Sequence, residues 1–214
     1  DELAHVRFLR SAGALGAAKV AQPQIDLRGG ANTPFGNAAA AAGLDPNFSP
    51  YASPEAFLLG AYIFEDVGVT AYKGAAPLIT NATFLEAAAG ILAVEAYHAA
   101  IVRSTLYRKG IETPTSQLIE ATTAISRARD SLDGRPTEDL VRGIAPNDDF
   151  GVAPTTTSDG TVANIFPGNV NGIAYSRSAG QTLNIVYLTA SQTTSGGFFP
   201  AGVNGTIRTS AAST

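Results

Sequence analysis

One long apolar segment, residues 81–109, restricts the folds open to this chain more than any other feature. Asn81 or Thr80 is suited to cap a helix at its start, and Gly110 is expected to end it. Such a helix has about 28 residues and spans roughly 42 Å at 1.5 Å per residue. Apolar side chains occur almost all the way round it, a pattern typical of a helix surrounded by other helices. We therefore expect this helix in the middle of a helical bundle.

Other periodic apolar patterns predict further helices on either side of this segment. The expected helices are residues 1–20, residues 53–72 with the start Ser53-Pro54-Glu55, residues 115–131, and a short helix or, as the less favoured alternative, a strand at 178–189. The fold class is therefore all-α. We expect a helical bundle over residues 1–132 and a C-terminal extension over 133–214 that packs on it, both within a single structural domain.

Long segments rich in Gly, Pro, Asn and Thr separate these helices. Residues 28–54 predict an ordered crossover loop with one short helical turn at 38–42. The tail over 196–207 contains Phe198 and Phe199, and we expect both rings to dock on the helices.

Charge and composition exclude several classes of function. The formal net charge is −4 and lysines and arginines do not cluster, which argues against a nucleic-acid partner. No apolar run reaches the roughly 18 uninterrupted residues expected of a transmembrane segment, so none is predicted. Cysteine is absent, which excludes disulfides and thiolate metal ligands. Methionine is absent as well, so we expect that an N-terminal piece has been removed or lies outside this sequence.

The two histidines carry the main functional signal. Each follows a glutamate by three residues, in the pairs Glu2–His5 and Glu95–His98. Helix positions i and i+3 lie on one face, so the carboxylate and the imidazole of a pair can reach the same point. Oxygen and imidazole ligands without sulfur suit iron or manganese. Two such pairs on neighbouring helices, joined by further carboxylates, predict a site for two metal ions.

A third helix offers another carboxylate, Glu65. It interrupts the apolar run 61–69, where burial without a cation is unfavourable, and it precedes Glu95 by 30 residues. That separation brings the two side chains together on adjacent antiparallel helices. The neighbouring Asp66 points about 100° away and is expected to cap a helix, pair with a base or face solvent. A simpler alternative stays open, since Glu–His pairs at this spacing also occur on ordinary solvated helices.

Tyrosines near these positions are candidates for supporting roles. Tyr62, Tyr72 and Tyr97 are close in sequence to the proposed ligands and would be hydrogen-bond partners of the ligands or sinks for oxidation. The alternative for each is plain core packing with a satisfied hydroxyl.

Several segments resemble the ferritin-like proteins, in particular the subgroup of plant desiccation-related proteins and stress-response relatives in fungi and bacteria. The segments are DELAHVRFLR, FLLGAYIFEDVGVTAYKGAAPLI, AAAGILAVEAYHAAIVR, ISRARDSLDG and GGFFPAGVNGTI. The resemblance extends from Asp1 through the tail, whose motif is specific to this subgroup. It implies a ferritin-like four-helix bundle with long ordered loops and a wrapping C-terminal tail.

The resemblance also implies a ligand set. Glu2 and His5 match the pair on the second helix of the bundle, Glu65 the carboxylate of the third, and Glu95 with His98 the pair on the fourth. The carboxylate of the first helix has no counterpart, so this chain is expected to lack that helix, and we expect one to precede Asp1. In such a site Glu65 and Glu95 would bridge the ions and the imidazoles would be terminal ligands.

The function implied by the resemblance is that of a stress- or desiccation-associated protein. Two Fe or two Mn ions would act on peroxide, oxygen or Fe(II), as in a catalase-like or ferroxidase-like oxidoreductase. The alternative is a non-catalytic structural or protective extracellular scaffold with a vestigial metal site. Metal analysis of the purified protein distinguishes the two.

Location and partners are weaker expectations. Sequons at Asn47, Asn81 and Asn204 fit an extracellular or cell-envelope protein, with Asn204 the best glycosylation site and Asn81 favoured as a helix cap. The expected partners are small oxidants or metal ions, with a homo-oligomer or a surface assembly left open.

Overall fold

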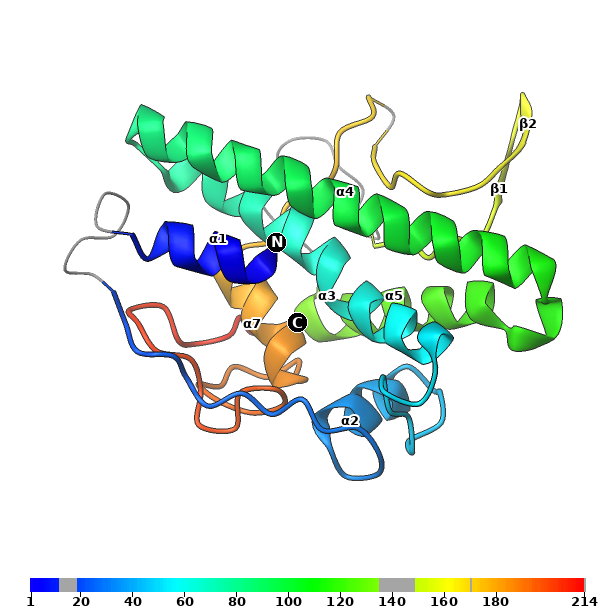
Figure 1. Cartoon of the computed structure of the whole chain (residues 1–214), viewed down its shortest axis with the longest axis horizontal. Coiled ribbons are helices and arrows are strands. Elements are labelled where there is room, and N and C mark those ends of the chain that lie inside the picture. Colours follow the sequence, from blue (N-terminus) through cyan, green and yellow to red (C-terminus); the bar gives the residue numbers. More distant parts are fainter. Residues whose placement is uncertain (12–18, 135–148, 170, 214) are drawn as a thin grey trace.

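A pair of long helices forms the centre of the molecule. The computed structural model describes residues 1–11, 19–134, 149–169 and 171–213. Helix α3 (Pro54–Ala75) and helix α4 (Ala82–Glu112) lie side by side, joined by the short 3-10 helix η2 (Ala76–Leu78) (Figure 1). The side chain of Ser53 accepts a hydrogen bond from the backbone at the start of α3, and that of Asn81 does so at the start of α4. Both predicted helix starts are therefore confirmed.

Two shorter helices complete the helical body. Helix α5 (Leu118–Asp133) follows the 3-10 helix η3 (Pro114–Ser116) and packs on α3 and α4, while α7 (Ala179–Tyr187) packs on α5 and α3. The all-α fold class is confirmed, as is the short helix in the segment 178–189. The core between these helices includes Tyr62, Leu106, Ile125 and Phe198.

The N-terminal helix is shorter than predicted and packs little apolar surface. Helix α1 (Glu2–Leu9) has no buried residue, and its side chains Leu3, Val6 and Phe8 are exposed. Within the expected helix over 1–20, α1 ends at Leu9 and residues 19–20 have no regular structure, so the prediction is wrong at those positions; residues 12–18 lie outside the described part of the chain. Apolar spacing indicated only which face could be buried, whereas packing decides where a helix ends.

Helix α4 is not enclosed on all sides, contrary to the prediction. Tyr97 is 71% exposed and Ile101 is 67% exposed. Among the described residues this helix is the one whose length and composition would suffice to cross a membrane, a criterion that core helices of soluble bundles also meet. Its Glu95 and Arg103 side chains are nevertheless buried against other parts of the chain. The apolar pattern wrongly predicted full burial of α4, because the pattern does not show which sides of a helix are covered by other elements.

The segments between the helices are ordered and lie on the helical body. The crossover 28–54 contains α2 (Pro34–Ala41), whose 8 residues start four positions before the predicted turn at 38–42 and end one position before that turn ends, and Phe35 is buried. In the tail, Phe198 is buried and Phe199 is partly buried, as predicted. The Phe198 ring contacts Phe35 and Phe64 edge to face, with centroids 5.1 and 4.9 Å away. A small hairpin of β1 (Thr155–Thr157) and β2 (Gly160–Val162) was not predicted.

Buried arginines join the C-terminal extension to the helices. Arg129 on α5 donates to Asp149 at 2.6 Å and to Asp66 at 3.0 Å, and Arg177 donates to Asp149 at 2.7 Å. Burial raises the pKa of Asp149, but the charges of Arg129 and Arg177 outweigh it and leave that pKa below its ordinary value. Removal of one partner would leave a buried charge unpaired, so these contacts hold residues 149–177 in place on the bundle.

Candidate metal centre

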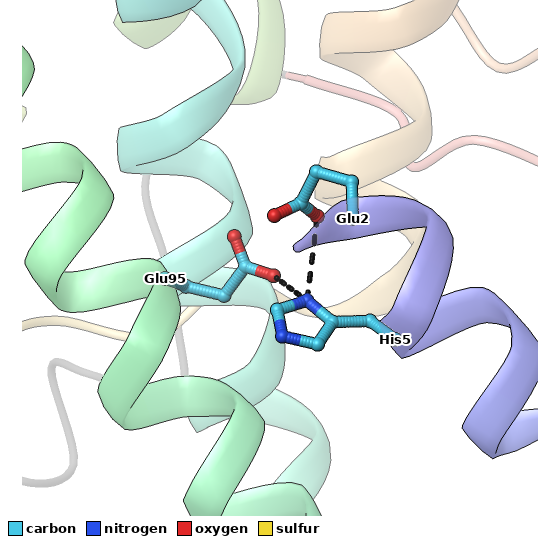
Figure 2. A group of neighbouring side chains, drawn as sticks. All are labelled: Glu2, His5 and Glu95. Atoms are coloured by element: carbon cyan, nitrogen blue, oxygen red, sulfur yellow. Dashed lines mark ion pairs between the residues drawn. The ribbon is translucent and has the colours of Figure 1, made fainter.

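Helix α1 brings one glutamate and one histidine to the carboxylate of Glu95 on α4. His5 Nδ1 lies 3.3 Å from Glu95 Oε1 and 3.5 Å from Glu2 Oε2. Figure 2 shows the three side chains pointing at one another, two of them from α1 and one from α4. Glu95 is nearly buried, whereas the Glu2 side chain is 60% exposed, so this group has a solvent-facing side.

A second group of side chains adjoins the first. His98 Nδ1 lies 3.2 Å from Glu2 Oε1 and 3.7 Å from Glu65 Oε2. Glu65, Glu95 and His98 also have ligand atoms within 4.8 Å of one another. All five residues of the predicted ligand set are thus brought together, from α1, α3 and α4. Glu2 has one carboxylate oxygen beside each imidazole, so it lies between the two groups.

Several buried atoms in this cluster have no hydrogen-bond partner among the described residues. They are His5 Nδ1, Glu65 Oε2 and His98 Nδ1. Buried polar atoms in proteins are nearly always paired, and an orphaned one costs on the order of 1–3 kcal/mol. Imidazole nitrogens and carboxylate oxygens that face one another without hydrogen-bond geometry are atom types that bind cations. The residues present therefore fit iron or manganese.

A glycine in α3 makes room for one of these carboxylates. A Cβ atom added at Gly68 would lie 3.2 Å from Glu95 Oε2, closer than most side chains tolerate. A glycine inside a helix costs about 1 kcal/mol relative to alanine, and such a residue often has a packing role. Sequence reasoning missed Gly68, although its place one turn after Glu65 was a usable signal.

Two carboxyl groups of the cluster, Glu65 and Glu95, have raised pKa values. The pKa of Glu65 is raised to about 7, mainly by burial; His98 opposes this rise, and the charges of Glu95 and Glu2 contribute to it. Burial likewise raises the pKa of Glu95, with the Glu2 charge as the next cause. The negative charges of Glu2, Glu65 and Glu95 repel one another at these distances. A divalent cation between them would attract all three carboxylates and offset that repulsion.

Asp1 is a further member of the cluster that the sequence reasoning did not select. Its Oδ2 lies 3.2 Å from His98 Nε2, within hydrogen-bond distance. A carboxylate on the outer nitrogen of a histidine fixes the orientation of the ring and leaves the other nitrogen free to bind a metal. In the sequence, only its position beside Glu2 hinted at this role.

The tyrosines divide differently from the prediction. The Tyr62 hydroxyl donates to the Phe150 carbonyl at 3.2 Å and accepts from Arg103 at 3.3 Å, so it belongs to the arginine cluster. Tyr97 is largely exposed. Tyr72 is partly buried, and its pKa is raised by burial and then by the charges of Glu95 and Glu2. Of the three tyrosines, Tyr72 is the one whose pKa is raised by the charges of Glu95 and Glu2.

Two further sequence predictions concern polar side chains outside the cluster. Asp66 pairs with Arg103 at 2.7 Å and with Arg129 at 3.0 Å, which confirms that it pairs with a base. The Asn81 amide oxygen caps α4, and the Asn204 amide nitrogen donates to the Ala21 carbonyl at 2.8 Å. Both candidate glycosylation side chains thus already make contacts in the fold.

The bundle and its cluster define the class of protein. The chain belongs to the ferritin-like family, since the model of the ferritin-like domain matches residues 1–108. It is 29% identical over 209 residues, 96% of this chain and 63% of the relative, to the desiccation-related protein PCC13-62 of Craterostigma plantagineum. It is 30% identical over 167 residues, 77% of this chain and 51% of the relative, to the ferritin-like catalase Nec2 of Nesocodon mauritianus.

The chain thus spans between half and two thirds of the length of these relatives. No solved structure matches the sequence.

Proposed function

We propose that the cluster binds two iron or two manganese ions and that the protein acts on peroxide, oxygen or Fe(II). The observation that carries the proposal is the convergence of orphaned buried atoms from α1, α3 and α4 on one place. The proposed ligands are Glu2, His5, Glu65, Glu95 and His98. The name of the catalase-like relative supports the same chemistry.

Each ligand would have a distinct role. His5 and His98 would bind through Nδ1, the nitrogen that each ring directs at the carboxylates. Glu2, with one oxygen beside each imidazole, is better placed to bridge than Glu65, which lies near His98 alone of the two histidines among the described ion pairs. The bound ions would supply redox and Lewis-acid chemistry.

The surrounding residues would control access and orientation. Among the described residues, the Asp1 and Glu2 side chains are 69% and 60% exposed, so small oxidants would reach the site from their side. Asp1 would hold the His98 ring in position. On the opposite side, Glu95 is buried against Gly68, which would shield that carboxylate from water.

Metal analysis of the purified chain tests the proposal. We expect about two Fe or Mn ions per chain, with oxygen release from added peroxide as the readout of activity. Glu95→Gln should lower both, whereas Glu86→Gln, a matched change of an exposed glutamate on the same helix, should lower neither. A folded wild-type chain that binds no metal would contradict the proposal and would favour the scaffold function.

A further inference from the structure

One face of α4 is exposed along most of the helix and contains none of the five proposed ligands. Its members follow one another at intervals of three or four residues, so they lie in one line along the helix. We call them the outer stripe of α4: Glu86, Gly90, Ala93, Tyr97, Ile101, Ser104 and Arg108. All seven are exposed. Helix α1 and the segment around Ile165 contact other sides of α4, so no element in the described part of the chain covers this stripe (Figure 1).

The middle of the outer stripe is apolar. Tyr97 and Ile101 lie about one helical turn apart, and both are largely exposed. Phe166, which is 80% exposed, lines a cavity together with Ala96 and Ala100 and so extends this apolar area beside the stripe. An exposed apolar area of this kind on a folded protein marks a surface for contact with another molecule.

A glycine in the outer stripe points to the same conclusion. Glycine inside a helix is less favourable than alanine, because it loses more conformational freedom on folding. A Cβ atom added at Gly90 would meet no atom within 4 Å, so packing within the described chain does not require a glycine here. A second helix that packs closely against the stripe would require one, since the missing side chain lets two backbones approach.

The two ends of the outer stripe have opposite charges. Glu86 precedes Tyr97 by 11 residues, and Arg108 follows it by 11. The Glu86 carboxylate has no ion pair or hydrogen bond with another described residue. Arg108 donates to Glu112 through Nη1 alone, at 2.9 and 3.2 Å, so its Nε and Nη2 can donate to a second carboxylate. Each end of the stripe is therefore able to pair with an opposite charge from another molecule.

The outer stripe is complementary to itself when it is reversed about Tyr97. An antiparallel second copy of the stripe, related by a two-fold axis at Tyr97, would bring Glu86 of each copy opposite Arg108 of the other. Two-fold interfaces require such self-complementarity, because the same surface contributes both sides. A second copy of this chain is therefore the partner that the charges select.

We propose that the chain forms a homodimer through the outer stripe, with the two α4 helices antiparallel and Tyr97 at the centre. Gly90 would face Ser104 of the other copy, so the two backbones would approach closely. Ala93 would leave space for Ile101 of the other copy. Exposed ion pairs contribute little to stability. The charged ends therefore fix the direction and register of the two helices, and burial of the apolar middle supplies most of the affinity.

Sedimentation velocity of the intact chain over a range of concentrations tests the proposal. The wild type should form a dimer at micromolar concentrations. Tyr97→Glu places two like charges at the two-fold axis and should raise the dimer dissociation constant about 100-fold. Gly90→Leu should raise it about tenfold and leave the circular-dichroism spectrum unchanged, because the added side chain has open space in the single chain. Phe57→Glu, a matched change of an exposed aromatic residue on α3, should leave the dimer unchanged.

Reversal of the charges tests the register. Glu86→Arg alone puts two arginines opposite each other at both ends and should weaken the dimer about tenfold. The double variant Glu86→Arg with Arg108→Glu restores opposite charges and should dimerise within about threefold of the wild type. A parallel pair of helices, or a pair centred elsewhere, would not show this rescue.

A single cysteine supplies a second measurement, because the chain has no cysteine of its own. Oxidation should link two copies of Tyr97→Cys through a disulfide, whereas Phe57→Cys should stay a single chain. This crosslink decides the question even if Tyr97→Glu does not fold.

Other results would overturn the proposal. These are a wild type that stays monomeric up to about 1 mM, a dimer that both Tyr97→Glu and Gly90→Leu leave unchanged, or a lack of rescue by the double charge reversal. Binding of a monomeric wild type to phosphatidylcholine vesicles would also overturn it and would assign the outer stripe to a membrane surface.

Discussion

Replacement of Glu65 by glutamine should change how the stability of the metal-free protein depends on pH. The pKa of Glu65 rises from 4.5 to about 7 because the carboxyl is buried on α3, with Glu95 and Glu2 as further causes. The unfolded chain therefore ionises this group at a lower pH than the folded chain does. Between about pH 4.5 and pH 7 the folded state holds the extra proton, so the wild type loses stability as pH rises through this window.

The size of the effect follows from the two pKa values. One pH unit corresponds to 1.36 kcal/mol, so a rise from 4.5 to about 7 amounts to at most about 3.4 kcal/mol. The Glu2 side of the cluster is open to solvent, and screening there reduces this figure to about 1–3 kcal/mol. Glutamine imitates the protonated carboxyl. Metal-free Glu65→Gln should therefore be more stable than the wild type by about 1–3 kcal/mol at pH 8, with no difference near pH 4.5.

Urea unfolding in the presence of a chelator, at intervals from pH 4.5 to pH 8, measures this difference. Glu86→Gln on α4 is the control, because this glutamate is exposed, and its curve should follow that of the wild type. With metal bound, the order at pH 8 should reverse, since the variant loses a ligand and the stabilisation that accompanies binding. If the metal-free curves of wild type and Glu65→Gln ran parallel across this range, the electrostatic argument would be refuted.

Three further outcomes are expected. Removal of metal should speed trypsin cleavage at Arg10, because α1 has no buried residue and meets α4 through the cluster; equal cleavage with and without metal would contradict this. The Asp1 carboxylate orients the His98 ring, so Asp1→Asn should weaken metal binding about 10- to 100-fold in a competition assay. The melting temperature of the metal-free chain should stay unchanged. Phe198→Ala should cost about 3–5 kcal/mol in urea unfolding, with metal content preserved, because it empties an aromatic cluster that includes none of the proposed ligands.

Most of the ligand set could be predicted from the sequence because its spacing is a local property. Residues three apart on a helix share a face whatever the helix packs against, so each Glu–His pair could be recognised without a partner. The 30-residue separation of Glu65 from Glu95 correctly predicted that they lie close together, because α3 and α4 are joined by a short connection. Helix starts at Ser53 and Asn81 depend on a hydrogen bond to the backbone two or three residues on, which is local as well.

Other features depended on contacts between distant segments. Arg129 lies near the end of α5, and its burial depends on Asp149 and Asp66, which pair with it from other parts of the chain. Tyr62 and Tyr97 are close to ligands in sequence, but one hydroxyl is bonded to Arg103 and the other side chain faces solvent. Neither result can be obtained from helical spacing. Spacing shows which side chains share a face of one helix, but it does not show which residues of other segments pack against that face.

By itself, the sequence determined the α-helical class, the helix starts and which acids and histidines share a helical face, because these follow from backbone geometry over one or two turns. Only the tertiary structure decided that α4 has an open flank, that Asp1 meets His98, and that the Tyr62 hydroxyl bonds to Arg103. Those outcomes depend on how segments far apart in the chain pack together, and no periodicity within one segment encodes them.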